Sequence, residues 1–250
     1  MEICAIAGFY RRYACAARII RMYMLQDYPG NSVLLLYNNG PEVYTLEDIK
    51  LPANKEIILI NNNKELATGL PYKDTGTIFN DSLTFIPEDV DIVTFMDTDD
   101  AYSPQHLSEL VKGYERALEQ GKLGYKPKYS WFKYAGHPPE LQYNTMEPSW
   151  TVNKEFLLKH GMHPLTASYH KRWIDALEKE NLAFVDPEGP TTFLYYWNGD
   201  DGVYKTSSKG DGEDSFQELR KWEKDGGNNV LSPCSIEEIQ KYYNIVGWGI

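Results

Sequence analysis

Short apolar runs alternate with amphipathic stretches through the first 120 residues of the chain. Four apolar runs have the length and composition of buried strands: residues 3–9, 32–37, 56–60 and 91–96. The stretches between them have apolar residues at helical spacing, over residues 14–25, 76–84 and 104–119. Continuous apolar strands separated by helices are typical of a mostly parallel sheet with helices on both faces. The sequence therefore predicts an α/β fold.

The start of the third of these helices has its own signal. Ser103 followed by Pro104 predicts a helix whose cap is the serine and whose first turn holds the proline. Beyond residue 120 the pattern is less regular. Strands are predicted over 128–134 and 191–197, and a long Gly-, Asp- and Ser-rich loop over 198–215. Further helices are predicted over 153–160, 168–180, 214–224 and 235–243.

Neither an internal repeat nor a linker divides the chain. We therefore predict one domain over residues 1–250, with a nucleotide-binding half at 1–120 and an irregular acceptor half with C-terminal helices at 121–250.

Charge and cysteine content exclude several classes of protein. The 250 residues carry a formal net charge of −11, and no run of Lys or Arg stands out. Non-specific binding of nucleic acid or of an anionic membrane surface is therefore not expected. Three cysteines without CxxC spacing argue against a disulfide framework or a zinc site, so a reducing cytoplasm is the expected compartment. A signal peptide is not expected either, and no apolar run approaches the ~18 residues of a membrane span.

An acidic cluster follows the fourth predicted strand, at Asp97, Asp99 and Asp100 around Thr98. In open α/β sheets, ligands bind beyond the carboxyl ends of the strands. Three carboxylates so close together repel one another, and a bound cation relieves that repulsion. Mg²⁺ and Mn²⁺ prefer oxygen ligands and commonly share carboxylates with substrate phosphates. These three aspartates are therefore the predicted metal ligands, although an Asp after a strand also often caps a helix.

Two other predicted strands end in polar residues. Tyr10, Arg11 and Arg12 follow the first strand, and Asn38-Asn39-Gly40 follows the second. If the strands are parallel, these residues face the same crevice as the acidic cluster. Turn formation is the plainer interpretation of Asn-Asn-Gly, because Asn and Gly tolerate positive φ.

Several motifs occur in a fixed order over about the first 110 residues. Tyr10-Arg11-Arg12 ends the first strand, Gln26-Asp27-Tyr28-Pro29 ends the first helix, Asn80 lies on the second helix, and the segment from Asp97 to Pro104 follows the fourth strand. In this order and spacing, residues 3–110 resemble the nucleotide-binding half of family 2 glycosyltransferases, which have the GT-A fold. Asn38 and Asn39 stand where that family carries acidic residues that contact the base or ribose.

This resemblance implies a metal-dependent, inverting transfer of a sugar from a nucleoside diphosphate sugar to an acceptor hydroxyl. The implied cofactor is Mn²⁺ or Mg²⁺, and the implied donor is a UDP-sugar. The residues implied to contact the sugar nucleotide are Tyr10, Arg12, Asn38, Asn80, Asp97, Thr98 and Asp99.

The second half resembles the family less closely. The segment from Ser149 to Phe156 resembles the part that lines the acceptor site, which makes Trp150 and Asn153 the acceptor-site candidates. The family's base lies in a Glu-Asp pair that opens a helix, and Glu213-Asp214 matches it, so Asp214 is the predicted catalytic base. In a competing register the base helix is 168–180, and Ser168-Tyr169-His170 takes that place. Asp200, Asp201, His170 and Asp175 are the remaining candidates. Trp131, Trp150 and Trp197 could stack on sugars or simply pack in the core.

Two other functions fit part of the pattern. A nucleotidyltransferase also combines an α/β sheet, a metal and a nucleotide, but Gly8-Phe9-Tyr10-Arg11-Arg12 is not the Gly-rich basic loop expected there. A non-catalytic carbohydrate-binding protein on a transferase fold is the other alternative. The acceptor could be a glycan, a protein, a small molecule or a modified base of viral DNA, and the negative net charge weakens the last option. A cytoplasmic protein of a bacterium, or of a phage- or virus-infected cell, fits these expectations. The oligomeric state stays open.

Overall fold

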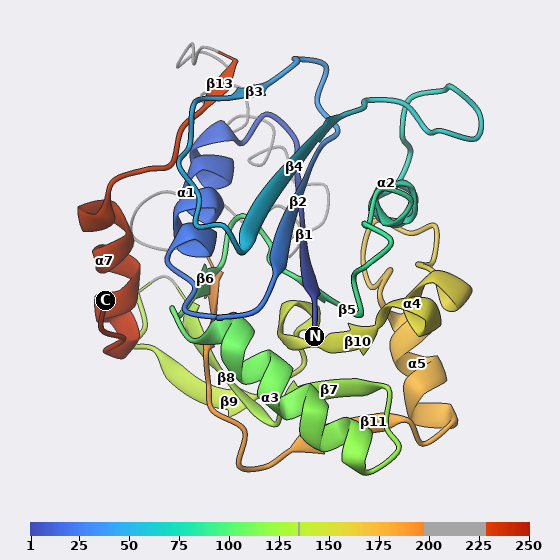
Figure 1. Cartoon of the computed structure of the whole chain (residues 1–250), viewed down its shortest axis with the longest axis vertical. Coiled ribbons are helices and arrows are strands. Elements are labelled where there is room, and N and C mark those ends of the chain that lie inside the picture. The colour runs from blue at the N-terminus through green and yellow to red at the C-terminus, as the bar shows by residue number, and fades with distance from the viewer. Residues whose placement is uncertain (135, 198–228) are drawn as a thin grey trace.

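A seven-stranded sheet forms the centre of the protein, in a computed structural model that describes residues 1–134, 136–197 and 229–250 (Figure 1). Its strand order is β11-β7-β10-β5-β1-β2-β4. The strands are β1 (Ile3–Phe9), β2 (Ser32–Asn38), β4 (Lys55–Asn61), β5 (Ile92–Phe95), β7 (Gly124–Pro127), β10 (Thr151–Asn153) and β11 (Ala183–Asp186). β10 runs antiparallel to β5 and β7, and the other pairs of neighbours are parallel.

Helices cover both faces of this sheet. One face carries α1 (Tyr13–Met24), α3 (His106–Glu119) and α7 (Ile236–Val246), and the other carries α2 (Thr75–Leu83), α4 (Lys154–His160) and α5 (Lys171–Lys179) (Figure 1). Alternation along β1 explains how one strand serves both layers. Ile3 and Ala5 belong to the core under α1, whereas Cys4 and Ile6 belong to the core under α2 and α5. The predicted α/β sheet with helices on both faces is confirmed.

Two smaller sheets complete the described fold. One has the order β6-β12-β8-β9, formed by β6 (Ala101–Tyr102), β12 (Phe193–Trp197), β8 (Tyr129–Tyr134) and β9 (Glu140–Tyr143). The other pairs β13 (Val230–Leu231) with β3 (Thr45–Leu46). β6 follows β5 almost directly, so the four-stranded sheet lies next to the carboxyl edge of the main sheet. A short 3₁₀ turn, η1 (Glu147–Ser149), precedes β10 and contacts β5.

The structure corrects the predicted start of the third helix. α3 begins at His106, and its N-cap residue is Gln105, whose side chain makes no capping hydrogen bond. Ser103 instead contributes its carbonyl, which accepts a hydrogen bond from the His106 amide at 3.0 Å. Pro104 thus lies in a turn before the helix rather than in its first turn.

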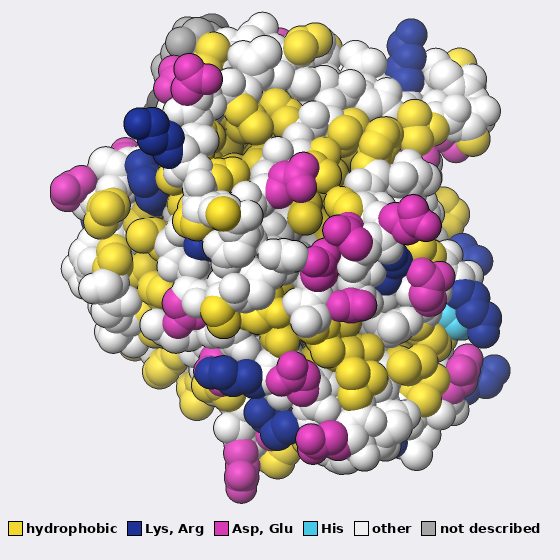
Figure 2. All heavy atoms as spheres, in the orientation of Figure 1, with side chains coloured by type: hydrophobic (Ala, Val, Ile, Leu, Met, Phe, Trp, Pro, Cys, Tyr) yellow, Lys and Arg dark blue, Asp and Glu magenta, His cyan; other side chains and the backbone are white. Residues whose placement is uncertain are grey.

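The strands β7, β10 and β11 extend the main sheet, although the sequence did not predict them. The predicted helix 214–224 and the predicted loop 198–215 lie outside the described residues. None of the helices described is long and apolar enough to cross a membrane. On the face drawn in Figure 2, acidic and basic side chains are interspersed, with no continuous basic stripe.

Candidate functional site

The acidic cluster lies where β5 ends. The Met96 amide still donates to the Ile6 carbonyl at 2.9 Å, and then the chain turns, with the Asp100 amide donating to the Asp97 carbonyl at 3.3 Å. The turn leads directly into β6. Because β1 and β2 lie parallel to β5, their carboxyl ends reach the same edge of the sheet. The polar residues that follow β1, β2 and β5 therefore lie at the same edge of the sheet.

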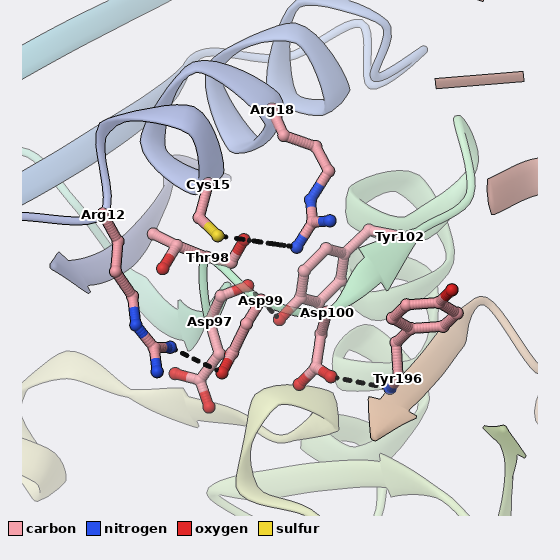
Figure 3. Close-up of polar contacts among 9 residues, drawn as sticks. All are labelled: Arg12, Cys15, Arg18, Asp97, Thr98, Asp99, Asp100, Tyr102 and Tyr196. Carbon is pink, nitrogen blue, oxygen red and sulfur yellow. Dashed lines mark hydrogen bonds and ion pairs between the residues drawn. The ribbon is translucent and has the colours of Figure 1, made fainter. Parts of the chain in front are cut away.

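The three carboxylates of the cluster converge. One oxygen from each of Asp97, Asp99 and Asp100 lies within 4.8 Å of the others. Their side chains point away from α1, as Figure 3 shows. Asp99 and Asp100 are buried, with 9% and 1% of their surface exposed, whereas Asp97 is half-buried. Three convergent carboxylates are a ligand set suited to Mg²⁺ or Mn²⁺, so the residues present fit the predicted metal.

Arg12 forms an ion pair with Asp99. Its Nη1 lies 2.9 Å from Asp99 Oδ2, and both side chains are 12% exposed. The pair brings the turn after β1 against the turn after β5, from positions 87 residues apart in the chain. Charge-assisted hydrogen bonds of this kind are stronger than neutral ones. A cation that binds Asp99 must therefore compete with a guanidinium that is already in place.

Hydrogen bonds from β12 and α1 hold Asp100 and Thr98 in place. Asp100 Oδ1 accepts a hydrogen bond from the Tyr196 amide of β12 at 2.9 Å. The Thr98 carbonyl accepts one from Arg18 Nη2 of α1 at 3.0 Å. Tyr102 lies beneath the turn, and its hydroxyl donates to the Asp97 carbonyl at 3.4 Å. Burial, and then the charges of Asp100, Asp97 and Asp99, raise the pKa of Tyr102 far above its ordinary value, so the phenol stays a neutral donor.

Asn38 is the last residue of β2, and its side chain supports the turn that follows the strand. The residue is fully buried, its Oδ1 accepts from the Gly40 amide at 2.9 Å, and its Nδ2 donates to Asn61 Oδ1 at 2.9 Å and to the Glu42 carbonyl. These contacts correct the implied role in nucleotide binding, because the side chain has no surface to offer a ligand. The side chain thus supports a turn, but the predicted reason was wrong, because none of Asn38, Asn39 and Gly40 has positive φ.

Asn80 and Tyr10 lie in different settings. Asn80 Oδ1 accepts from the Met162 amide at 2.7 Å and its Nδ2 donates to the Met162 carbonyl at 3.2 Å, so this side chain ties α2 to the segment after α4. Each of these two atoms can make one further hydrogen bond, and the side chain is half-buried. Tyr10 is 38% exposed after β1, with the Arg11 guanidinium 5.5 Å from its ring centroid. Its ring is therefore accessible at the edge where the cluster lies.

The two predicted acceptor-site residues are used for packing and capping. Trp150 is 1% exposed, edge-to-face with Trp173 at 5.9 Å, and covered by Lys126, whose Nζ lies 4.9 Å from the ring centroid. Asn153 caps α4 by accepting from the Phe156 amide at 3.0 Å. It also pairs with Ile92, the first residue of β5, which places it at the opposite edge of the sheet from Asp97. Both residues are therefore corrected to structural roles.

Of the other tryptophans proposed for stacking, Trp131 is half-buried against the core under α1. The side chain of Trp197 lies outside the described part of the structure.

The predicted bases divide into two groups. Asp214, Asp200 and Asp201 lie outside the described residues. His170 is 3% exposed, and its ring lies 4.7 Å from the Phe95 ring and 4.0 Å from the Tyr169 ring. Burial lowers the pKa of His170 to about 3, so its imidazole is a weak base.

Asp175, the remaining candidate, is exposed on α5. Its position on that helix gives it no described contact with the acidic cluster.

The sequence did not single out three groups around the cluster: Arg18, Tyr196 and Glu147. Arg18 carried the clearest signal, because it interrupts the buried face of α1, between Cys15 and Met22. Glu147 lies on η1, and its charge, with those of Asp97 and Asp99, raises the pKa of Tyr169 after the larger effect of burial. Tyr196 was not predictable, since it contributes its backbone amide.

Comparison with known proteins supports the fold. No protein-family model matches the chain, and no curated protein sequence matches it either. Solved structures of S. aureus TarS, a glycosyltransferase, are similar in fold, and both UDP and UDP-GlcNAc complexes of its fragment 1–349 are among them.

The UDP-GlcNAc complex superimposes with a TM-score of 0.54 and 13% identity, covering 99% of this chain and 80% of that one. The UDP complex gives a TM-score of 0.54 and 12% identity over 89% of this chain and 64% of that one. A structure named simply TarS gives 0.55 and 13%, covering 79% of this chain and 37% of that one, so the present chain spans well under half of its length. The chain thus has a GT-A-like glycosyltransferase fold.

Proposed function

We propose that this protein is a metal-dependent glycosyltransferase that moves a sugar from a UDP-sugar to an acceptor hydroxyl with inversion. One observation carries the proposal: three convergent carboxylates lie at the carboxyl edge of a GT-A-like sheet. The similarity of fold to a protein crystallised with UDP-GlcNAc supports the choice of donor. Carboxylate oxygens suit a divalent metal that also binds the donor's diphosphate.

The residues around the cluster have distinct roles in this proposal. Asp97, Asp99 and Asp100 would hold Mn²⁺ or Mg²⁺, which neutralises the charge that develops on the departing diphosphate. Arg12 lies beside Asp99 and carries a planar guanidinium that matches the geometry of phosphate oxygens. It would bind the diphosphate once the metal occupies the carboxylates. Thr98 lies between Asp97 and Asp99, is buried, and is held through its carbonyl by Arg18.

The second half of the reaction needs a base that accepts the proton of the acceptor hydroxyl. Attack on the anomeric carbon from the side opposite the diphosphate inverts that centre, and a positioned base contributes about 10²–10⁴-fold. Asp214 remains the proposed base. Glu147 is a second candidate, because η1 contacts the end of β5 and its charge acts on the same tyrosine as Asp97 and Asp99. Comparing Asp214→Asn with Glu147→Gln distinguishes these two candidates. Turnover should fall, with donor affinity kept, in the variant that lacks the base.

A donor screen tests the proposal directly. UDP-, GDP- and dTDP-sugars are offered with and without Mn²⁺, and nucleotide release is measured. We expect release of UDP that requires the metal. Asp99→Asn should abolish this release, whereas Asp89→Asn, an exposed carboxylate before β5, should leave it unchanged. Full metal-dependent release by Asp99→Asn would overturn the metal assignment, and pyrophosphate as the product would indicate a nucleotidyltransferase.

A non-catalytic carbohydrate-binding protein is the second candidate. The observation that favours it is the start of α5, where Ser168, Tyr169 and a buried neutral His170 stand in place of a carboxylate. Calorimetry distinguishes the two. Binding of UDP-sugar with Mn²⁺ but no release of UDP with any glycan, protein or small-molecule acceptor would favour the binding protein.

A further inference from the structure

The C-terminal helix α7 contacts the support of the acidic cluster through Tyr242. The Tyr242 hydroxyl accepts a hydrogen bond from Arg18 Nη1 at 2.5 Å, and its ring centroid lies 4.5 Å from the Arg18 guanidinium carbon. Arg18 is only 4% exposed. A buried cation requires compensating contacts, and an aromatic face and a hydroxyl both supply them. Tyr242 therefore helps to fix the position of the guanidinium.

The other side of the same guanidinium holds the acidic segment. Arg18 Nη2 donates to the Thr98 carbonyl at 3.0 Å and lies 4.0 Å from Cys15 Sγ (Figure 3). The Thr98 carbonyl belongs to the peptide plane that leads into Asp99, and this plane is rigid. The hydrogen bond to this carbonyl therefore restrains the orientation of the peptide that joins Thr98 to Asp99.

A second route joins Tyr242 to the cluster. Its ring meets the Tyr196 ring edge-on, with centroids 5.4 Å apart and an interplanar angle of 78°. The Tyr196 amide in turn donates to Asp100 Oδ1 at 2.9 Å. Tyr242 is thus linked to Thr98 through Arg18 and to Asp100 through Tyr196, although it lies more than 140 residues further along the chain.

The start of α7 is itself firmly held on α1. Arg21 Nε donates to the Cys234 carbonyl at 2.6 Å. Ser235 and Glu238 then form a capping box that satisfies the first amides of the helix. α7 is therefore a defined element at this point, and the position of Tyr242 follows from the docking of α7 on α1.

We propose that Tyr242 is a positioning residue of the acidic cluster, and that α7 acts through Arg18 and Tyr196 to hold the Asp97–Asp100 backbone in the geometry that binds the metal–diphosphate. The inference rests on the proposed function for the identity of the ligand. The backbone restraint itself does not depend on it. Groups that orient metal ligands commonly change metal affinity by about 10–100-fold when they are removed.

The first experiment measures the restraint without any ligand, by amide hydrogen exchange of the whole protein. In Tyr242→Leu, which loses ring and hydroxyl, amides of residues 97–102 should exchange at least about tenfold faster, while β1 keeps the exchange of the unsubstituted protein. Tyr242→Phe keeps the ring and should give a smaller change. Lys241→Ala, an exposed neighbour on the same helix, is the matched control and should change neither segment.

The second experiment measures the affinity for Mn²⁺ by calorimetry in the presence of UDP. We expect about 10–100-fold weaker binding in Tyr242→Leu, a smaller loss in Tyr242→Phe and none in Lys241→Ala. In an Arg18→Met background the effect of Tyr242→Phe should disappear, because its hydroxyl acts through that guanidinium. Such non-additivity is not expected of a residue that only stabilises the fold.

Two results would overturn the inference. One is exchange at residues 97–102 that stays unchanged in Tyr242→Leu, and the other is exchange that rises equally in β1, which would mean general destabilisation. Failure of the proposed function is a separate outcome, visible in the unsubstituted protein as no binding of Mn²⁺ with UDP. The exchange experiment still decides the role of Tyr242 in that case.

Discussion

Replacing Arg12 with Met should make the protein bind Mn²⁺ more tightly in the absence of a donor. Arg12 Nη1 lies 2.9 Å from Asp99 Oδ2, and both side chains are only 12% exposed. A metal ion that binds this oxygen must displace the guanidinium or share the oxygen with it. Removing the guanidinium therefore removes a competitor, and methionine keeps most of the apolar length of the side chain.

The size of the effect follows from the geometry of the pair. A hydrogen bond to a charged group contributes about 1.5–3 kcal/mol when it is shielded from water. Taking about 2 kcal/mol, and about 1.4 kcal/mol per tenfold in affinity, Arg12→Met should lower the Kd for Mn²⁺ roughly thirtyfold. The opposite sign is expected for the donor, because UDP loses the cation that is proposed to bind its diphosphate.

Calorimetric titrations with MnCl₂ alone, and with UDP in the presence of saturating Mn²⁺, measure both effects. Arg11→Met is the matched control, since Arg11 is the adjacent residue but pairs with Glu42, at 3.0 Å, instead of the acidic cluster. It should leave the Mn²⁺ titration unchanged. An Arg12→Met protein that binds Mn²⁺ no better than the unsubstituted protein would refute the competition between guanidinium and metal.

Two further substitutions test the surrounding structure. Burial lowers the pKa of His170 to about 3 from an ordinary 6.5. Between these two pH values only the unfolded state binds a proton at this imidazole, so the stability that is present above pH 6.5 is lost as the pH falls toward 3. At about 1.4 kcal/mol per pH unit, His170 accounts for about 2 kcal/mol of the free energy of unfolding that is lost between pH 7 and pH 5, so His170→Phe should lose that much less over this range in urea unfolding. The matched control is the exposed His137→Phe, which should lose as much as the unsubstituted protein. An equal loss in the two variants would contradict the prediction. Gly113→Ala should destabilise the folded protein by about 1–3 kcal/mol, although alanine has the better helix propensity. The reason is that a Cβ at this position would lie 2.0–2.4 Å from atoms of the Tyr125 ring. An unchanged midpoint of urea unfolding would show that the ring can move aside.

The first half of the fold was predictable because local pattern and tertiary role agree there. Strand β1 is apolar throughout and buried on both faces, and the same is true of most of β2 and β5. Sequence periodicity is sufficient when every residue of a strand enters the core. The predicted and observed bounds of β1 coincide, and α1 and α2 differ from prediction by a residue at either end.

The strands of the second half depend on partners distant in sequence. β7 is Gly-Tyr-Lys-Pro, which has the composition of a turn, yet all four residues are buried. Lys126 is accommodated because its Nζ donates to the Asn144 carbonyl at 2.8 Å, and Tyr125 because Gly113 of α3 leaves room for its ring. β10 has only three residues and continues directly into α4, so the strand was missed and its last residue, Asn153, was placed in the predicted helix 153–160. Such strands form only where the rest of the sheet supplies neighbours.

The same distinction applies to the site. Asp97, Asp99 and Asp100 lie within four residues, so their convergence could be expected from the sequence alone. Their supporting contacts could not, because Arg12 and Arg18 come from α1 and its preceding turn, and Tyr196 comes from β12 through a backbone amide. Pairs separated by 80 to 96 residues depend on topology that no local motif encodes.

The formal charges of the described residues connect the cluster to the proposed substrate. Asp97, Asp99 and Asp100 contribute three negative charges, and Arg12 and Arg18 contribute two positive ones at the same turn. A divalent ion offsets the excess negative charge of this turn, and the Arg12–Asp99 pair competes with the ion until a diphosphate provides Arg12 with another anion. Metal and diphosphate should therefore increase each other's affinity by the same factor, as linkage requires. In the proposed function, such a site would bind the complex of metal and diphosphate better than either free metal or free nucleotide.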